Sequence, residues 1–314
     1  MLTRWRVYPT WTKPDCFSSL SWHTSPSDDP KLEPQETIWD AILSLGPNIL
    51  DLTIEADTLE VPLNNIELLT NLESMSLLSM PMYDTSPSVV SAVSKLYFSS
   101  PTLKSITIRK EFSDPCLLSI HMPSGPPSLR HLDLTNCFIP FYEPTTLSRL
   151  SNLTSLTYSI FRGQPDSKYS PEKMWMALKA SGIQLEELVV REGAVTASLV
   201  DYLTTISGLK ILLLSLIASS SPTGTAAQFW SAAFPNHTNT LEEFALYAGD
   251  ESEWCFSTQN CPLIVQCTRL MVLNLCISSQ PGQDLVPNKL ILDDAVSGFP
   301  HFKTASSMGF LRKL

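Results

Sequence analysis

The chain has 314 residues and a formal net charge of −10, and hydrophobic and charged residues make up 43% and 17% of it. This composition supplies enough apolar surface for a folded core and differs from that of disordered chains. Proteins that bind nucleic acid or anionic membranes normally present a basic surface, so the acidic balance argues against both as partners.

Neither a membrane-spanning segment nor a secretion signal is evident in the sequence. The longest apolar run, residues 209–218, is about half of the ~20 residues needed to cross a bilayer. Residues 1–11 contain no continuous apolar stretch of the kind found in signal peptides. The seven cysteines are odd in number and not closely paired, which is typical of reduced thiols. We therefore expect a cytoplasmic or nuclear protein.

A six-residue phrase recurs along the chain, with apolar residues at its first, fourth and sixth positions. Clear copies occupy residues 72–77, 103–108, 129–134, 153–158, 185–190, 209–214, 241–246 and 270–275; weaker copies begin at Phe17 and Ile49, and a degenerate copy begins at Phe302. Neighbouring copies start 23 to 32 residues apart, a spacing that indicates a repeat architecture. The alternation in the second half of each phrase predicts a short strand whose fourth and sixth residues face the core.

Helical segments are predicted between the strands. In chain order the candidates are residues 37–45, 88–98, 170–182, 196–208, 225–234 and 290–298. Ser170 and Pro171 provide a cap and a proline at the first helical position, and Gly182 is expected to end that helix. Thr196 is the expected cap of the next helix, which ends at Gly208.

The phrase resembles the leucine-rich repeat, and the longer units that contain helices resemble its ribonuclease-inhibitor-like and F-box-associated branch. The likeness covers roughly residues 17 to 302 and is specific in the first six positions of each unit. The family usually places Asn or Cys three residues after the third apolar position, and only Cys137 satisfies this. The resemblance implies an α/β solenoid with a curved parallel sheet on its concave face and helices and short turns on its convex face. A parallel β-helix is the alternative, which the capped helices and variable spacing disfavour.

Three segments follow from this interpretation. Residues 1–16 are expected to form an N-terminal cap or an irregular segment, residues 17–301 a leucine-rich-repeat array of about ten units, and residues 302–314 a degenerate final repeat or a C-terminal cap. Solenoids need caps over their terminal cores, and Trp5, Trp11 and Phe17 could form an apolar lid at the first end.

The third, fifth and seventh positions of each phrase are expected to point outward along the concave face. These positions change from small and polar in the early units to apolar in the late ones. We expect an exposed apolar patch of Val189, Ile211, Leu213, Ala245, Tyr247 and Val272, bordered by Glu187, Arg191, Glu243 and Asn274. Contiguous apolar surface on a folded protein usually marks a binding site, and an aromatic residue beside charged groups is typical of interface hot spots.

Signs of chemistry are weak. Four cysteines lie close together in sequence, namely Cys255, Cys261, Cys267 and Cys276. Zinc sites usually have two to four residues between paired ligands, so we interpret these cysteines as buried core residues and expect no metal or cofactor. His131 and Asp133 share the concave face without a recognisable nucleophile, which favours a recognition contact over acid–base catalysis. We expect no enzymatic activity.

The sequence therefore predicts a protein–protein interaction module that binds a partner on its concave face. The family resemblance suggests a substrate-recognition subunit of a cullin-RING ubiquitin ligase, with components of that ligase as partners, although the F-box that precedes the repeats in that family is not found. The alternative is a regulator or inhibitor of an enzyme. A GTPase-activating solenoid would have Arg109 or Arg191 as its active arginine.

Overall fold

The structure is a computed structural model of residues 1–314. It describes residues 11–13, 16–17, 19–24, 35–56, 65–80, 96, 100–110, 116–117, 129–138, 147, 150–159, 171–193, 195–216, 224–248, 253–277, 292–294, 297 and 303–309. The chain divides into two compact units. Unit 1 comprises Met1–Leu153 and Ile160–Tyr169, and unit 2 comprises Thr154–Ser159 and Ser170–Leu314.

Unit 1 contains a parallel sheet whose strands follow one another in chain order. These strands are β3 (Ser19–Thr24), β4 (Asp51–Ala56), β5 (Ser74–Met80), β6 (Ser105–Lys110) and β8 (His131–Thr135). The short strands β1 (Trp11–Lys13) and β2 (Cys16–Phe17) form an antiparallel pair, and β7 (Cys116–Leu117) pairs with β9 (Cys137–Phe138) in parallel. The helical elements are α1 (Gln35–Ser44) and the 3₁₀ turns η1 (Gly46–Asn48) and η2 (Ile66–Leu68).

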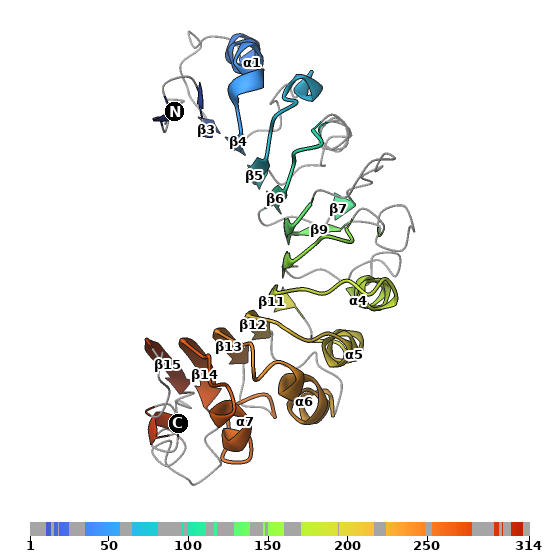
Figure 1. Ribbon diagram of the computed structural model, residues 1–314, viewed down its shortest axis with the longest axis vertical. Coiled ribbons are helices and arrows are strands. Elements are labelled where there is room, and N and C mark those ends of the chain that lie inside the picture. Colours follow the sequence, from blue (N-terminus) through green and yellow to red (C-terminus); the bar gives the residue numbers. More distant parts are fainter. Residues whose placement is uncertain are drawn as a thin grey trace, which may run out of the picture. The chain divides into compact units, whose positions relative to one another are not determined.

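Unit 2 contains a second run of parallel strands in chain order. They are β10 (Ser155–Ser159), β11 (Glu187–Gly193), β12 (Ile211–Leu216), β13 (Glu243–Ala248), β14 (Val272–Ile277) and β15 (Thr304–Gly309). The helices are α4 (Pro171–Ala180), α5 (Ala197–Thr205), α6 (Thr225–Gln228), the π-helical η4 (Phe229–Ala233), the 3₁₀ turn η5 (Phe234–Asn236) and α7 (Cys261–Val265). In Figure 1 the helices α4 to α7 lie on one side of these strands.

The predicted fold class is confirmed: the chain is α/β, with parallel strands in sequence order, as in a repeat solenoid. Each clear phrase forms one strand, and its apolar residues are buried. In the unit that contains β11, Leu185, Leu188 and Val190 are all at most 2% exposed. Because the fourth and sixth residues of each clear phrase face the core, stacking neighbouring repeats joins their apolar sides within each compact unit.

Large aromatic side chains fill the space between strands and helices in unit 2. Trp175 of α4 stacks on Tyr202 of α5 at a ring-centroid distance of 6.0 Å, and its edge meets Tyr158 of β10 at 6.1 Å. Phe244 of β13 lies 4.8 Å from the ring of Phe234. These contacts tie α4 to β10 and to α5 of the next repeat, and η5 to β13.

The predicted helices at residues 37–45, 170–182 and 196–208 correspond to α1, α4 and α5, and their ends differ from the predicted ones by up to three residues. The side chain of Thr196 accepts a hydrogen bond from the backbone N–H of Leu199 and so caps α5. Gly182 has a φ of 66°, a left-handed conformation that ends α4 with little steric cost. The helix expected at residues 37–45 is α1.

Two expectations differ. The helix predicted for residues 225–234 changes from α to π to 3₁₀ geometry along its length, and the short helix α7, with Pro262 in its first turn, was not predicted. Most of the helix predicted at residues 88–98 lies outside the described residues, as does part of that predicted at residues 290–298.

Candidate functional site

The ten residues predicted to form or border a binding patch all lie in unit 2, on the strands β11 to β14. Parallel register aligns them in rows that cross the strands. One row contains Glu187, Ile211, Glu243 and Val272, and the next contains Val189, Leu213, Ala245 and Asn274. Neighbours within a row are about 4.8 Å apart along the backbone, so their side chains are in contact range.

These rows lie on the face of the sheet opposite the helices. In β12 the inward residues Leu212 and Leu214 are fully buried, whereas Ile211 and Leu213 are partly exposed. The same alternation holds at Val189 of β11 and Val272 of β14. Among the described residues of unit 2, this face has no helix over it (Figure 1).

Ala245 is a correction to the predicted patch, because it is only 2% exposed. It lies in register between Leu213 and Asn274, and their longer side chains extend beyond its methyl group. Ala245 therefore supports the patch from below and offers almost no surface of its own. The exposed apolar patch, as the name is used from here on, consists of Val189, Ile211, Leu213, Tyr247 and Val272.

Two glutamates lie beside the apolar patch in the register of the strands. Glu187 and Glu243 lie on either side of Ile211 in the same row. Their backbones are two strands apart, about 10 Å along the row. Burial raises the pKa of the Tyr247 phenol, with smaller contributions from Cys276 and Glu243. The Tyr247 hydroxyl is therefore neutral and can donate a hydrogen bond to a bound partner.

Arg191 is less closely aligned with the other border residues. It pairs in register with Ser159 of β10, but the register between β11 and β12 shifts after Val190, so that Gly193 meets Leu216. Such a bulge redirects the side chains beside it. Arg191 is exposed, at the end of β11 where the regular rows stop.

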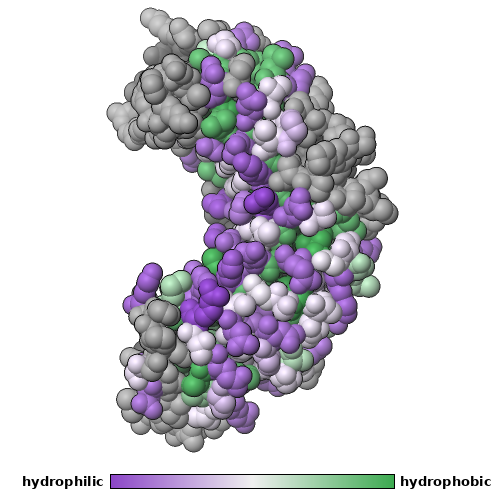
Figure 2. All heavy atoms as spheres, in the orientation of Figure 1, coloured by the Kyte–Doolittle hydropathy of each residue, from purple (hydrophilic) through white to green (hydrophobic). Residues whose placement is uncertain are grey.

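Figure 2 shows the hydropathy of one side of the molecule. On the side of unit 2 seen in this view, hydrophobic residues appear only in small areas between hydrophilic ones. Three large apolar side chains among the described residues are highly exposed, namely Leu68, Met176 and Val265, and they lie on different elements. Scattered apolar residues of this kind are ordinary on protein surfaces.

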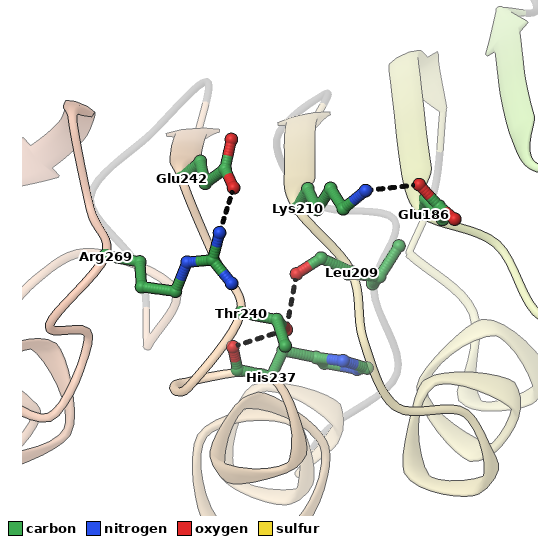
Figure 3. Close-up of polar contacts among 7 residues, drawn as sticks. All are labelled: Glu186, Leu209, Lys210, His237, Thr240, Glu242 and Arg269. Atoms are coloured by element: carbon green, nitrogen blue, oxygen red, sulfur yellow. Dashed lines mark hydrogen bonds and ion pairs between the residues drawn. The ribbon is translucent and has the colours of Figure 1, made fainter.

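Sequence reasoning missed a series of ion pairs where the strands begin. Lys210 Nζ lies 2.6 Å from a carboxylate oxygen of Glu186, and an Arg269 guanidinium nitrogen lies 2.9 Å from Glu242 (Figure 3). The signal was present, because Lys210 and Glu186 hold the same position in consecutive phrases. Both pairs are exposed and contribute little to stability.

The backbone beneath these ion pairs forms a repeated double hydrogen bond. The carbonyl of Glu186 accepts the N–H groups of both Lys210 and Ile211, at 2.7 and 3.1 Å, and the carbonyl of Lys210 accepts those of Glu242 and Glu243. The carbonyls of Thr154 and Glu242 do the same for the strands that follow them. Each of these repeats is thereby joined to the next one at the point where the next strand begins.

A second link between neighbouring repeats of unit 2 runs through the segment that follows η5 (Figure 3). The hydroxyl of Thr240 donates to the carbonyl of Leu209 at 2.7 Å and lies 3.1 Å from that of His237. His237 is fully buried, and its Nε2 lies 3.1 Å from the carbonyl of Leu203. The side chain of Asn236 also donates to the carbonyl of Thr204, which lies in the preceding repeat. Side chains of one repeat thus satisfy backbone carbonyls of the preceding repeat, at the end of α5 and just before β12.

Replacing Thr240 with valine is expected to lower the free energy of unfolding by about 1 kcal/mol, because the Leu209 carbonyl loses its donor while the volume is kept. Urea denaturation followed by circular dichroism measures this change. Asn239→Ala, an exposed neighbour in the same turn, is the control and should change stability by less than about 0.5 kcal/mol. Equal effects of the two substitutions would contradict a bridging role for Thr240.

The other candidate for chemistry is the pair His131 and Asp133 on β8. The Asp133 carboxylate is engaged by Arg109, 2.6 Å away, and His131 is exposed beside it. Among the described residues, no three His, Cys, Asp or Glu side chains are grouped so that they could hold a metal ion. In the same part of the chain, no helix combines the length and the hydropathy needed to cross a membrane.

Comparisons with known proteins do not assign the chain to a family. No protein-family model matches the sequence, and no curated protein matches it. Among solved structures, the chain is similar to a Bacteroides fragilis protein determined by the Northeast Structural Genomics Consortium, with 11% sequence identity and a TM-score of 0.38. The likeness covers 89% of this chain and 71% of that protein.

Proposed function

We propose that the chain is a leucine-rich-repeat protein that binds another protein through the exposed sheet face of unit 2. The observation that carries this proposal is the register of β11 to β14, which gathers the apolar patch on a face without a covering helix among the described residues. Burying such a patch against a partner is favourable by roughly 25 cal/mol per Å² of apolar surface.

The surroundings of the patch indicate the chemistry of the partner. Glu187 and Glu243 flank Ile211, so a partner segment with apolar side chains and an adjacent Lys or Arg would be complementary. Tyr247 adds an aromatic ring with a hydroxyl donor, a combination common in interface hot spots. Parallel sheets of stacked repeats provide a long, regular surface suited to extended segments of a partner.

A role as a substrate-recognition subunit of a cullin-RING ubiquitin ligase is the finer proposal, and it rests on the family resemblance of the repeats. The competing proposal is a regulator or inhibitor of a single enzyme. Both proposals describe a non-enzymatic binding protein of the cytoplasm or nucleus, where the thiols of the five described cysteines would be reduced.

The double substitution Leu213→Asp and Tyr247→Asp is expected to reduce partner recovery at least tenfold, because it places two charges in the centre of the apolar patch. Affinity purification of the full chain from cells, followed by quantitative mass spectrometry, measures the recovery. Circular dichroism should remain unchanged, because both side chains are already partly exposed. Recovered cullin-RING subunits would favour the ligase role, and one stoichiometric enzyme would favour the regulator.

The matched control is the double substitution Met176→Asp and Val265→Asp. These two side chains are 61% and 46% exposed and belong to α4 and α7, on the helical side of unit 2. Proteins that are lost with the first variant and kept with the control are partners of the patch. The same set of proteins recovered with both variants would refute the proposed binding face.

A further inference from the structure

Cys255 and Cys276 lie side by side in unit 2, although 20 residues separate them in the chain. Phe256 and Ile277, the residues that follow them, form a parallel β-bridge, and the N–H of Phe256 donates to the carbonyl of Cys276 at 2.7 Å. The two thiols are hydrogen-bonded to each other. Residues adjacent in register on parallel strands have Cα atoms about 5 Å apart, within the usual range for disulfides of about 4.4–6.8 Å.

The surroundings of Cys276 favour its thiolate. The hydrogen bond with Cys255 lowers the pKa of the Cys276 thiol, burial opposes this, and the backbone at Ala248 lowers it further. The N–H of Ala248 lies 3.1 Å from the Cys276 sulfur and can stabilise a negative charge there. The thiolate is the reactive form of cysteine, so Cys276 has the character of an attacking sulfur.

Other cysteines in this region have different surroundings. Cys267 is fully buried, its thiol donates to the carbonyl of Leu263, and burial raises its pKa to about 12. Burial also raises the pKa of Cys261, with a smaller contribution from Asp294. Cys267 matches the expected buried core residue, whereas Cys261 is only partly buried.

We propose that Cys255 and Cys276 are a redox pair that forms a reversible intramolecular disulfide when a small hydroperoxide reaches it. The Cys276 thiolate attacks one oxygen of hydrogen peroxide, the O–O bond breaks, and hydroxide leaves, which gives a sulfenic acid on Cys276. The Cys255 sulfur then attacks the Cys276 sulfur, the S–S bond forms, and the S–O bond breaks. The two thiol protons end in water, so two thiols and one peroxide give one disulfide and two water molecules.

The position of the pair decides what the disulfide would do. Cys255 belongs to the segment between β13 and α7, and Cys276 lies near the end of β14. Both are at most 2% exposed, so a reactant close to water in size is needed to reach them. The bond would join this connecting segment to β14 beside Tyr247. Cys276 contributes to the raised pKa of the Tyr247 phenol. The disulfide site itself does not depend on the proposed binding function.

The test uses the reduced full-length chain, treated with hydrogen peroxide without denaturant and then alkylated with a maleimide. Trypsin and chymotrypsin, which cleave after Arg269 and Phe256, separate Cys255, Cys276 and the cysteines between them into different peptides. We expect a Cys255–Cys276 cross-linked peptide that dithiothreitol removes. We also expect oxidation of Cys276 to be about tenfold or more faster than that of Cys267. The melting temperature should rise by about 5 °C, because the bond closes a loop of about 20 residues.

Two variants complete the design. Cys255→Ser should abolish the cross-link, and Cys267→Ser, a change at a buried cysteine outside the pair, should leave it intact. A chain that keeps both thiols after peroxide treatment, or that joins either one to a different cysteine, would overturn the proposal. Because the wild-type peptide map decides this directly, a variant that fails to fold does not affect the outcome.

Discussion

Replacing Phe244 with alanine is expected to lower the free energy of unfolding by about 3–5 kcal/mol, the usual cost of truncating a buried phenylalanine. Phe244 is fully buried at the centre of an aromatic cluster. Its ring lies 4.8 Å from that of Phe234, 6.1 Å from Trp230 and 6.5 Å from Phe229. These residues come from η4 and η5, so the loss removes the contact that holds this helical segment on β13. Urea denaturation followed by circular dichroism measures the change.

The control for Phe244 is its neighbour Glu243, which lies on the opposite face of the same strand. Glu243→Ala removes a partly exposed side chain and should change stability by no more than about 0.5 kcal/mol. A loss of less than about 1 kcal/mol for Phe244→Ala would mean that the aromatic cluster rearranges to fill the space. It would contradict the packing described for unit 2.

Stability is also expected to fall between pH 6.5 and pH 4 because of His237. Burial lowers the pKa of His237 to about 4, and the hydrogen bond to the Leu203 carbonyl only partly opposes this. A carbonyl can only accept, so Nε2 carries the proton of the neutral ring, and Nδ1 is buried without a hydrogen-bond partner. A second proton on Nδ1 would place an unpaired charge in the core.

The direction of this pH dependence follows from proton uptake. In the unfolded chain His237 binds a proton near pH 6.5, whereas in the folded chain it does so only near pH 4. The contribution to stability is therefore complete above pH 6.5 and is lost as the pH falls to 4, by up to about 3 kcal/mol. Urea denaturation at a series of pH values measures the slope.

His237→Gln is the matched variant, because its side-chain amide can still donate to the Leu203 carbonyl and does not titrate. The difference in stability between the wild type and this variant should shrink as the pH falls from 6.5 to 4 and stay constant above pH 6.5. Other titrating groups contribute equally to both proteins and cancel in the difference. Parallel stability curves over this range would show that His237 does not cause the effect.

The strands and their buried faces could be predicted from the sequence because they depend on local alternation. Leu188, Leu212 and Phe244 occupy the same position in their phrases, and each is buried as expected. The same alternation placed Val189 and Leu213 on the outer face. The register that joins them into one patch then follows, because each unit repeats the geometry of the previous one.

Features that depend on contacts between neighbouring repeats could not be predicted from the sequence in the same way. His237 lies in a polar turn, Asn236 to Thr240, and nothing in that local pattern indicates full burial. Its burial arises because the turn packs against the end of α5, which belongs to the preceding repeat. Ala245 failed as an exposed residue for a related reason, since the exposure of a small side chain depends on the size of its neighbours. The bridge that brings Cys255 to Cys276 likewise joins segments with no common spacing.

The shared carbonyls at the strand entrances have a consequence for how such a chain can lengthen. The repeats that contain β11, β12 and β13 each receive two N–H donors from the repeat after them and supply two to the repeat before them, through backbone atoms alone. A duplicated repeat inserted in frame would find a backbone carbonyl in the repeat before it and two backbone N–H groups in the repeat after it. These groups are the same whatever side chains the repeat carries. Growth by duplication therefore preserves the joint while the outward-facing residues are free to diverge.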